Sequence, residues 1–277
     1  MAFTFPGDCD ANLVADAAFA AAYDALAPEE RAAVKTAIAR MAAVHGTEDA
    51  VSGRCSRVMR QGFRLHAASR PAPWAVVLWD EAYAGPTRVL AALVPAMLAG
   101  VPDILACRVR RDGAPFPQPL LAALELAGQE LVMDASPEDA AGFVTRCCEA
   151  DPRGRLVLLG RDPVFETISR LAAERGTPVL RYAAPVRIGI PAGSVARPAP
   201  GDGLCFAQPD ADLISFEGEA SPGAFAAIFC AEGSAAEYLE AAPLVLCPGN
   251  EAYWAWPGLG RDFYRETSLG LSGVDPD

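Results

Sequence analysis

The stretch 85–128 constrains the fold more than any other part of this chain. Pro86 stands where a first-turn proline is tolerated, and apolar residues then recur at helical spacing until Gly100 offers a left-handed stop. A short apolar run and a second helical pattern complete the stretch. With further apolar runs at 74–79 and 130–133, the order is strand, helix, strand, helix, strand. This order predicts a parallel sheet with helices on both faces, the doubly wound α/β class.

The same alternation of helix and strand patterns continues to about residue 188, and 277 residues are enough for two domains. We therefore predict a Rossmann-like domain over 81–188. It is inserted in a second, smaller α/β domain made of 1–80 with 189–277. Within that second domain, two helices are expected over 12–26 and 28–48, the first with a cap at Asn12.

The segment 54–70 is basic in a chain whose formal net charge is −12. We interpret it as a solvated turn between elements. The alternative is that its arginines meet an anionic ligand or a partner subunit. They are Arg54, Arg57, Arg60, Arg64 and Arg70.

The acidic charge argues against nucleic acid or an anionic membrane surface as a partner. No apolar run approaches the roughly 20 residues of a membrane span, and the first residues lack a basic region followed by an apolar core. We therefore expect a cytoplasmic protein. The 8 cysteines show no paired metal spacing, so reduced thiols are expected.

Part of the first stretch matches a known pattern, which reads Pro-Ser-Ser-Val-Leu, then Ile-Pro-Ala, then Ala-Gly-Val. The residues that fall on it without a gap are Pro86, Val89, Leu90, Pro95, Ala96, Ala99, Gly100 and Val101. The pattern belongs to the histidinol dehydrogenase family, which this chain resembles and whose general fold the aldehyde dehydrogenases share. Weaker similarity recurs at 191–194 and over 227–268.

The resemblance implies a nicotinamide cofactor, a zinc that anchors the substrate, and a Glu-His pair for proton transfer. Of the family's zinc ligands, only the Asp of a Gly-Asp-Tyr motif has a counterpart, which is Glu237 followed by Tyr238. The Ser-Gln-Ala-Glu-His motif would fall within 195–206, which is too short to hold it. A catalytic zinc needs about three protein ligands, so we expect no zinc and no other metal site.

The family's Glu-His pair lies in the motif Ala-Pro-Glu-His-Leu-Glu, whose nearest echo here is 208–213. This segment keeps two acids, Asp210 and Asp212, which are the candidate catalytic bases, and it has no imidazole. At the nicotinamide site the family's Gly-Pro-Gly-Asn becomes 159–162, where Gly160 is the remaining candidate for cofactor contact. We expect NAD to bind weakly or not at all, because added Cβ atoms and an added acid oppose a pyrophosphate.

The leading hypothesis is a non-catalytic or repurposed relative that keeps an interdomain cleft and binds a small molecule there. Its candidate ligand-binding residues, by the resemblance, are Pro86, Ser194, Glu237 and Tyr238.

Two alternatives stay open. One is an active, metal-free oxidoreductase that uses NAD(P) on an alcohol or aldehyde, with Asp210 or Asp212 as base. The other is a subunit that works through its surface, as in a homodimer with Trp254 and Trp256 at the contact. Cys247 follows a short apolar run and precedes a glycine turn, but no basic residue near it in sequence favours a nucleophilic thiolate.

Overall fold

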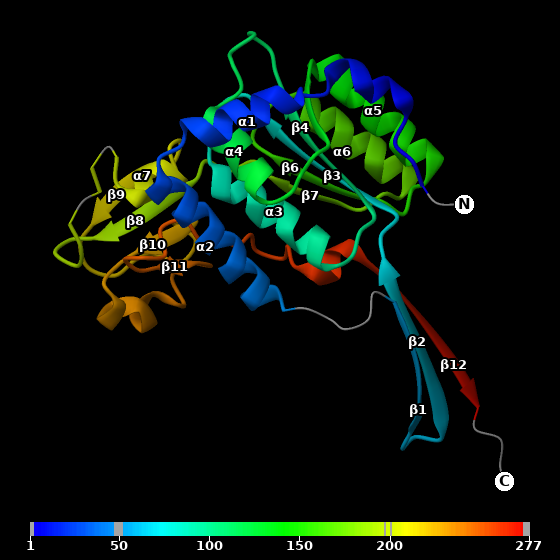
Figure 1. The fold of residues 1–277 in the computed structure, drawn as a ribbon. Helices are drawn as coiled ribbons and strands as arrows, with labels where there is room; N and C mark the ends of the chain where they lie inside the picture. Colours follow the sequence, from blue (N-terminus) through cyan, green and yellow to red (C-terminus); the bar gives the residue numbers. More distant parts are fainter. Residues whose placement is uncertain (1–2, 47–51, 197, 200, 274–277) are drawn as a thin grey trace.

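The computed structural model describes residues 3–46, 52–196, 198–199 and 201–273. Its centre is a five-stranded parallel sheet with the strand order β5-β4-β3-β6-β7 (Figure 1). The predicted doubly wound α/β class is confirmed. The strands are β3 (Trp74–Asp80), β4 (Asp103–Val109), β5 (Val132–Ala135), β6 (Arg155–Leu159) and β7 (Val179–Tyr182).

Helices cover both faces of this sheet. The first pair, α3 (Pro86–Leu98) and α4 (Gln118–Leu126), packs on one face, and α5 (Pro137–Ala150) and α6 (Val164–Arg175) pack on the other. Every residue of β3 from Trp74 to Trp79 is therefore buried, as expected of a strand covered on both sides.

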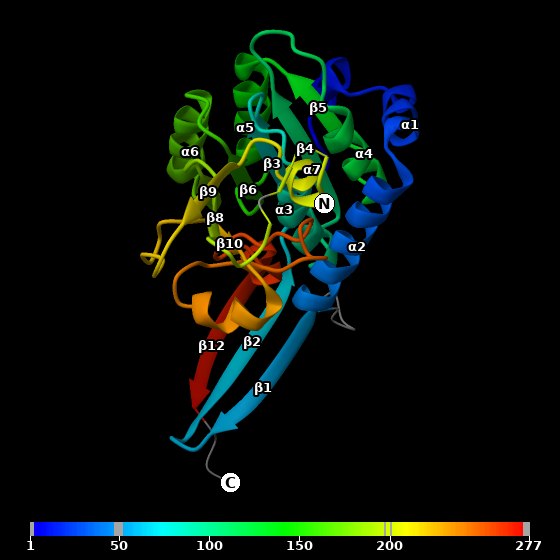
Figure 2. The same cartoon turned by 90° about the vertical axis from the view of Figure 1, so that its left-hand side faces the viewer.

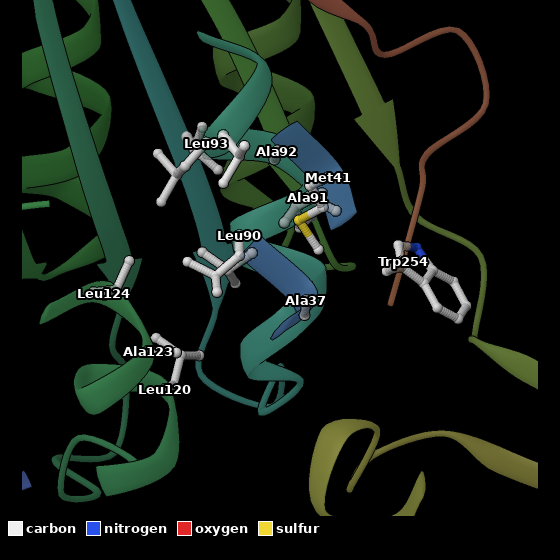
Figure 3. Close-up of a cluster of buried hydrophobic side chains, with 14 of the residues drawn as sticks. Ala37, Met41, Leu90, Ala91, Ala92, Leu93, Leu120, Ala123, Leu124 and Trp254 are labelled. Atoms are coloured by element: carbon white, nitrogen blue, oxygen red, sulfur yellow. The ribbon is translucent and has the colours of Figure 1, made fainter. Parts of the chain in front are cut away.

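The N-terminal helices α1 (Asp16–Ala25) and α2 (Pro28–His45) pack on α4 and α3 respectively. Figure 3 shows side chains of α2 and α4 lying around those of α3, with Trp254 from the C-terminal region beside them. The predicted helix start at Asn12 is wrong. That residue ends the 3₁₀ helix η1 (Gly7–Asn12), and the next residues are held extended because the Val14 N–H donates to the Val132 carbonyl at 2.8 Å.

The second sheet is also parallel and has the order β11-β10-β8-β9. Its strand β8 follows β7 after a short turn, so the chain passes directly from the first sheet into the second. Its strands are β8 (Arg187–Pro191), β9 (Asp212–Phe216), β10 (Ala227–Phe229) and β11 (Val245–Leu246). Around them lie α7 (Gly203–Ala207), η2 (Glu232–Tyr238) and η3 (Arg261–Tyr264).

The remaining strands form an arm that projects from the body (Figures 1 and 2). We use "the arm" for β1 (Gly53–Met59), β2 (Phe63–Pro71) and β12 (Arg265–Gly273), which pair antiparallel in the order β1-β2-β12. The prediction of a solvated turn over 54–70 is wrong, because this segment is a hairpin that turns at Gly62. The exposed strand β1 lacks the apolar alternation that reveals a half-buried strand.

The predicted domain limits stay a prediction. The five-stranded sheet itself begins with β3 at Trp74, ahead of the predicted start at residue 81, and its last strand ends at Tyr182. Among the described residues, no helix combines the length and the hydropathy that crossing a membrane requires. The cytoplasmic location predicted from the sequence likewise stays a prediction.

Candidate functional site

The strand order of the five-stranded sheet reverses beside β3, so the crevice at the carboxyl ends of β3 and β6 is where a doubly wound fold binds ligands. Asp80 ends β3, and Gly160 follows β6 with a φ of 115°. A Cβ added at Gly160 would lie 2.2 Å from a carboxylate oxygen of Asp80. Gly160 therefore allows the Asp80 side chain to fill the crevice.

The Asp80 carboxylate accepts the backbone N–H groups of Arg161 at 2.5 Å and Asp162 at 3.2 Å. Burial raises the pKa of Asp80, these two hydrogen bonds oppose the rise, and the charges of Asp162 and Asp210 add to it. The N–H groups next to α6 thus already bind an anion, which the chain itself supplies.

A second carboxylate also accepts backbone N–H groups, beyond the neighbouring strand β4. The carboxylate of Glu81 accepts the backbone N–H groups of Arg111 at 2.6 Å and Asp112 at 3.0 Å, in the loop after β4. The Arg111 guanidinium in turn binds the Asp162 carboxylate at 2.5 and 2.8 Å. The described residues at this edge do not fit NAD, because its pyrophosphate would meet carboxylates where it needs free N–H donors.

Arg88 lies in the first turn of α3 and is fully buried, although it carries a charge. It forms an ion pair with Asp210, whose side chain is 23% exposed. The Arg88 guanidinium carbon lies 4.5 Å from the ring centroid of Tyr83 and 5.8 Å from that of Trp254. The Trp256 indole N–H donates to the Arg88 carbonyl oxygen at 2.9 Å. We call these five residues the Arg88 cluster.

The Arg88 cluster keeps several buried polar atoms that bond to no other described residue. They are Nε and Nη1 of Arg88, the Tyr83 hydroxyl and the Trp254 indole nitrogen, together with Oε1 of the neighbouring Gln208. Most of them are donors, and each costs about 1–3 kcal/mol when it is left without a partner. The cluster is therefore suited to water or to a group that accepts hydrogen bonds.

A cavity of about 300 Å³ lies beside this cluster, where β7 leads into β8. We call it the junction cavity. Its walls are mainly apolar and include Tyr182, Val186, Ala226, Pro243, Trp254 and Trp256. The rings of Tyr182 and Trp256 stack with their centroids 4.4 Å apart, and burial raises the pKa of Tyr182 to about 12. The two tryptophans thus border both the cavity and Arg88.

The structure places the residues predicted from the sequence in two separate groups. Pro86 is buried at the start of α3, and Asp210 lies nearby in its ion pair with Arg88. Asp212 is exposed at the start of β9, where its backbone pairs with Arg187 at the amino end of β8. Gly160 lies at the crevice described above.

Ser194, Glu237 and Tyr238 form the other group, beyond the carboxyl end of β8. The Ser194 hydroxyl accepts the Ala231 N–H at 2.9 Å, Glu237 is exposed, and the Tyr238 ring packs edge-on against Phe216. Strand β8 lies between this group and the first. It has 5 residues, and a strand rises roughly 3.3 Å per residue. The predicted candidates therefore do not line a single cleft.

Sequence reasoning missed Arg88, Tyr83 and the junction cavity. The available signal was a charged residue within the otherwise apolar run of α3, at a position where the matched family pattern has serine. Trp254 and Trp256 are 1% and 8% exposed and lie in the main core, so the alternative that places them at a subunit contact is wrong. Among the described residues, no three His, Cys, Asp or Glu side chains come together in a way that could hold a metal ion.

Comparisons with known proteins find sequence similarity to histidinol dehydrogenases and a fold shared with a histidinol dehydrogenase and a succinate-semialdehyde dehydrogenase. No family model matches the chain. It is 29% identical over 200 residues to the histidinol dehydrogenase of Xanthomonas euvesicatoria pv. vesicatoria (strain 85-10), a match that covers 67% of this chain and 43% of that protein. For the histidinol dehydrogenase of Xanthomonas campestris pv. campestris (strain 8004), the identity is 28% over 204 residues, covering 69% and 44%. The chain spans less than half the length of these curated relatives.

Solved structures with the same fold include a histidinol dehydrogenase from Elizabethkingia anophelis. Its TM-score is 0.63 at 14% identity, covering 95% of this chain and 77% of that one. The succinate-semialdehyde dehydrogenase from Burkholderia pseudomallei has a TM-score of 0.50 at 11% identity, covering 89% and 77%. At these identities the likeness concerns the fold alone.

Proposed function

Because this chain is a divergent relative of the histidinol dehydrogenases, with an oxidoreductase-type α/β fold, we propose that it binds a small molecule without carrying out the family's reaction. The observation that carries this proposal is that the acidic side chains at the candidate site are already bonded to other groups of the chain. Asp210 pairs with the buried Arg88, and Asp80 accepts backbone N–H groups in the cofactor crevice. These carboxylates already have partners within the chain.

The junction cavity supports a ligand of particular chemistry. Its volume is at the lower end of the range for small-molecule sites, about 300–1,000 Å³, and its walls offer stacked aromatic rings. Such walls favour a small, largely apolar molecule with a planar ring.

The alternative of a metal-free oxidoreductase has less support. A general base must reach the proton that it removes, and Asp210 is committed to Arg88 while Asp212 lies exposed at the start of β9.

A panel of small planar acids, alcohols and aldehydes tests the binding proposal by thermal unfolding. We expect at least one of them to raise the melting temperature, and the effect to be lost in Ala184→Trp. Ala184 is exposed at the rim of the junction cavity, so the larger side chain narrows the cavity without entering the core. Ala236→Trp, on exposed η2, is the matched control and should keep the effect. An equal shift in both variants would place the ligand elsewhere.

We also propose that the arm joins two copies of this chain in a homodimer. Three strands with little buried surface do not make a stable unit in water, and Leu269 and Leu271 are 69% and 71% exposed on one face. The arm carries the basic segment 54–70, while the chain as a whole has a charge of −12. An arm of this charge complements the acidic body of a second copy.

Light scattering coupled to size exclusion should give the mass of a dimer for the unmodified chain. Leu269→Glu combined with Leu271→Glu should give a monomer, because the two charges would be buried in the contact. Leu239→Glu, which changes an equally exposed leucine on the body, is the control and should remain dimeric. A dimer that survives the double substitution would contradict this proposal.

A further inference from the structure

Two cysteines stand opposite each other where β10 and β11 end. These strands pair in parallel, with Phe229 opposite Leu246, and the Cys230 N–H donates to the Leu246 carbonyl at 2.9 Å. The next residue pair in this register is Cys230 and Cys247. Both are free cysteines.

The two side chains lie on the same face of the four-stranded sheet. Ile228 and Cys230 pack with Val245 and Cys247 in one apolar cluster, whereas Phe229, between the first two, packs in the main core on the other face. The Cys247 side chain lies close enough to that of Cys230 to raise the pKa of the Cys230 thiol. Neighbouring strands are about 4.7–4.9 Å apart, within the range of about 4.4–6.8 Å that the Cα atoms of a disulfide span.

The two thiols differ in their access to solvent. Cys230 is fully buried, and burial first, then the nearby Cys247, raises its pKa to about 11. Cys247 is half-buried, so a reagent from solution meets it first. This arrangement gives one accessible cysteine and, beside it, a protected one that can resolve an adduct.

We propose that Cys230 and Cys247 form a reversible dithiol and disulfide pair that small-molecule disulfides oxidise. The Cys247 thiolate attacks one sulfur of the reagent, whose S–S bond breaks and releases one thiolate. Cys230 then loses its proton to solvent and attacks the Cys247 sulfur, which releases the second thiolate. The two cysteines give up two electrons and two protons, and the reagent becomes two thiols.

Oxidation closes the segment 231–246 into a loop. That loop contains η2 and with it Glu237 and Tyr238, and a cross-link of this kind restricts the conformations open to the segment. The redox state of the pair would thus set how freely η2 moves. Neither the junction cavity nor Arg88 takes part in this cysteine pair.

The test is to treat the full chain with oxidised glutathione, block the remaining thiols, and map the peptides without reduction. We expect a peptide that joins Cys230 to Cys247 and the loss of both thiols from a colorimetric count. A reducing agent should restore them. In Cys230→Ser, the Cys247 adduct should persist as a mixed disulfide with glutathione.

Cys55→Ser is the control, because Cys55 is exposed on the arm, and it should leave the joined peptide unchanged. Amide hydrogen exchange over 231–246 should slow in the oxidised chain. Modification of Cys55 without any peptide that joins Cys230 to Cys247 would overturn the proposal. Exchange that stays equally fast after cross-linking would overturn the predicted effect on η2.

Discussion

Histidinol and NAD, given to this chain at high concentration with added zinc, should produce no reduced cofactor above background. A general acid–base group contributes about 10²–10⁴-fold to a rate, and a catalytic metal contributes several kcal/mol more by stabilising charge in the transition state. By the resemblance, the proton-transfer imidazole is expected to have no counterpart within 208–213, and Glu237 is the one zinc ligand expected to have a counterpart. Losing both groups should lower the rate more than about 10⁴-fold below that of an active relative.

The assay records reduced nicotinamide by absorbance, with an active histidinol dehydrogenase as the positive control. It should include other alcohols and aldehydes and both nicotinamide cofactors. Asp212→His alone should not restore turnover. The expected lack of zinc ligands would remain, and carboxylates would still occupy the N–H groups that NAD needs. Saturable turnover that disappears in Asp210→Asn or Asp212→Asn would refute the non-catalytic proposal and favour the metal-free oxidoreductase.

Replacing Asp210 by alanine should lower the free energy of unfolding by about 2–4 kcal/mol. Removing one member of a buried ion pair leaves the other charge uncompensated, which typically costs about 3–5 kcal/mol. Arg88 is fully buried, whereas the Asp210 side chain is 23% exposed, so we expect a value around and below the lower end of that range. Denaturant unfolding measures the change.

The double variant Arg88→Met with Asp210→Ala should recover most of this loss, because neither charge then remains buried. Asp212→Ala is the control, since this exposed residue should change the free energy of unfolding by less than about 0.5 kcal/mol. If Asp210→Ala proves as mild as Asp212→Ala, the ion pair does not organise the site.

The doubly wound sheet could be predicted because its signals are local and repeated. Strand β3 is a continuous apolar run, and α3 begins at Pro86 with helical periodicity behind it. Each such pattern reflects the burial of apolar residues against elements that lie within a few dozen residues along the chain. The alternation predicted to continue to about residue 188 is present as α5, β6, α6 and β7 for the same reason.

The arm and the site could not be predicted in this way. The arm joins β2 to β12, which are nearly two hundred residues apart in the chain, and its exposed strands carry no burial pattern. The Arg88 cluster gathers residues from α3, the loop before β9 and the C-terminal region. Sequence reasoning listed Asp210 as a candidate base because it could not show the arginine that the fold places beside it.

Calorimetric titration with NAD tests most directly whether the chain's own carboxylates fill the crevice at the carboxyl ends of β3 and β6. Losing two hydrogen bonds to phosphate costs about 3–6 kcal/mol, and about 4 kcal/mol separates a micromolar from a millimolar dissociation constant. Asp80 and Glu81 occupy the N–H donors that would make those bonds. We therefore predict millimolar or weaker binding of NAD, and a dissociation constant near one micromolar would contradict the account.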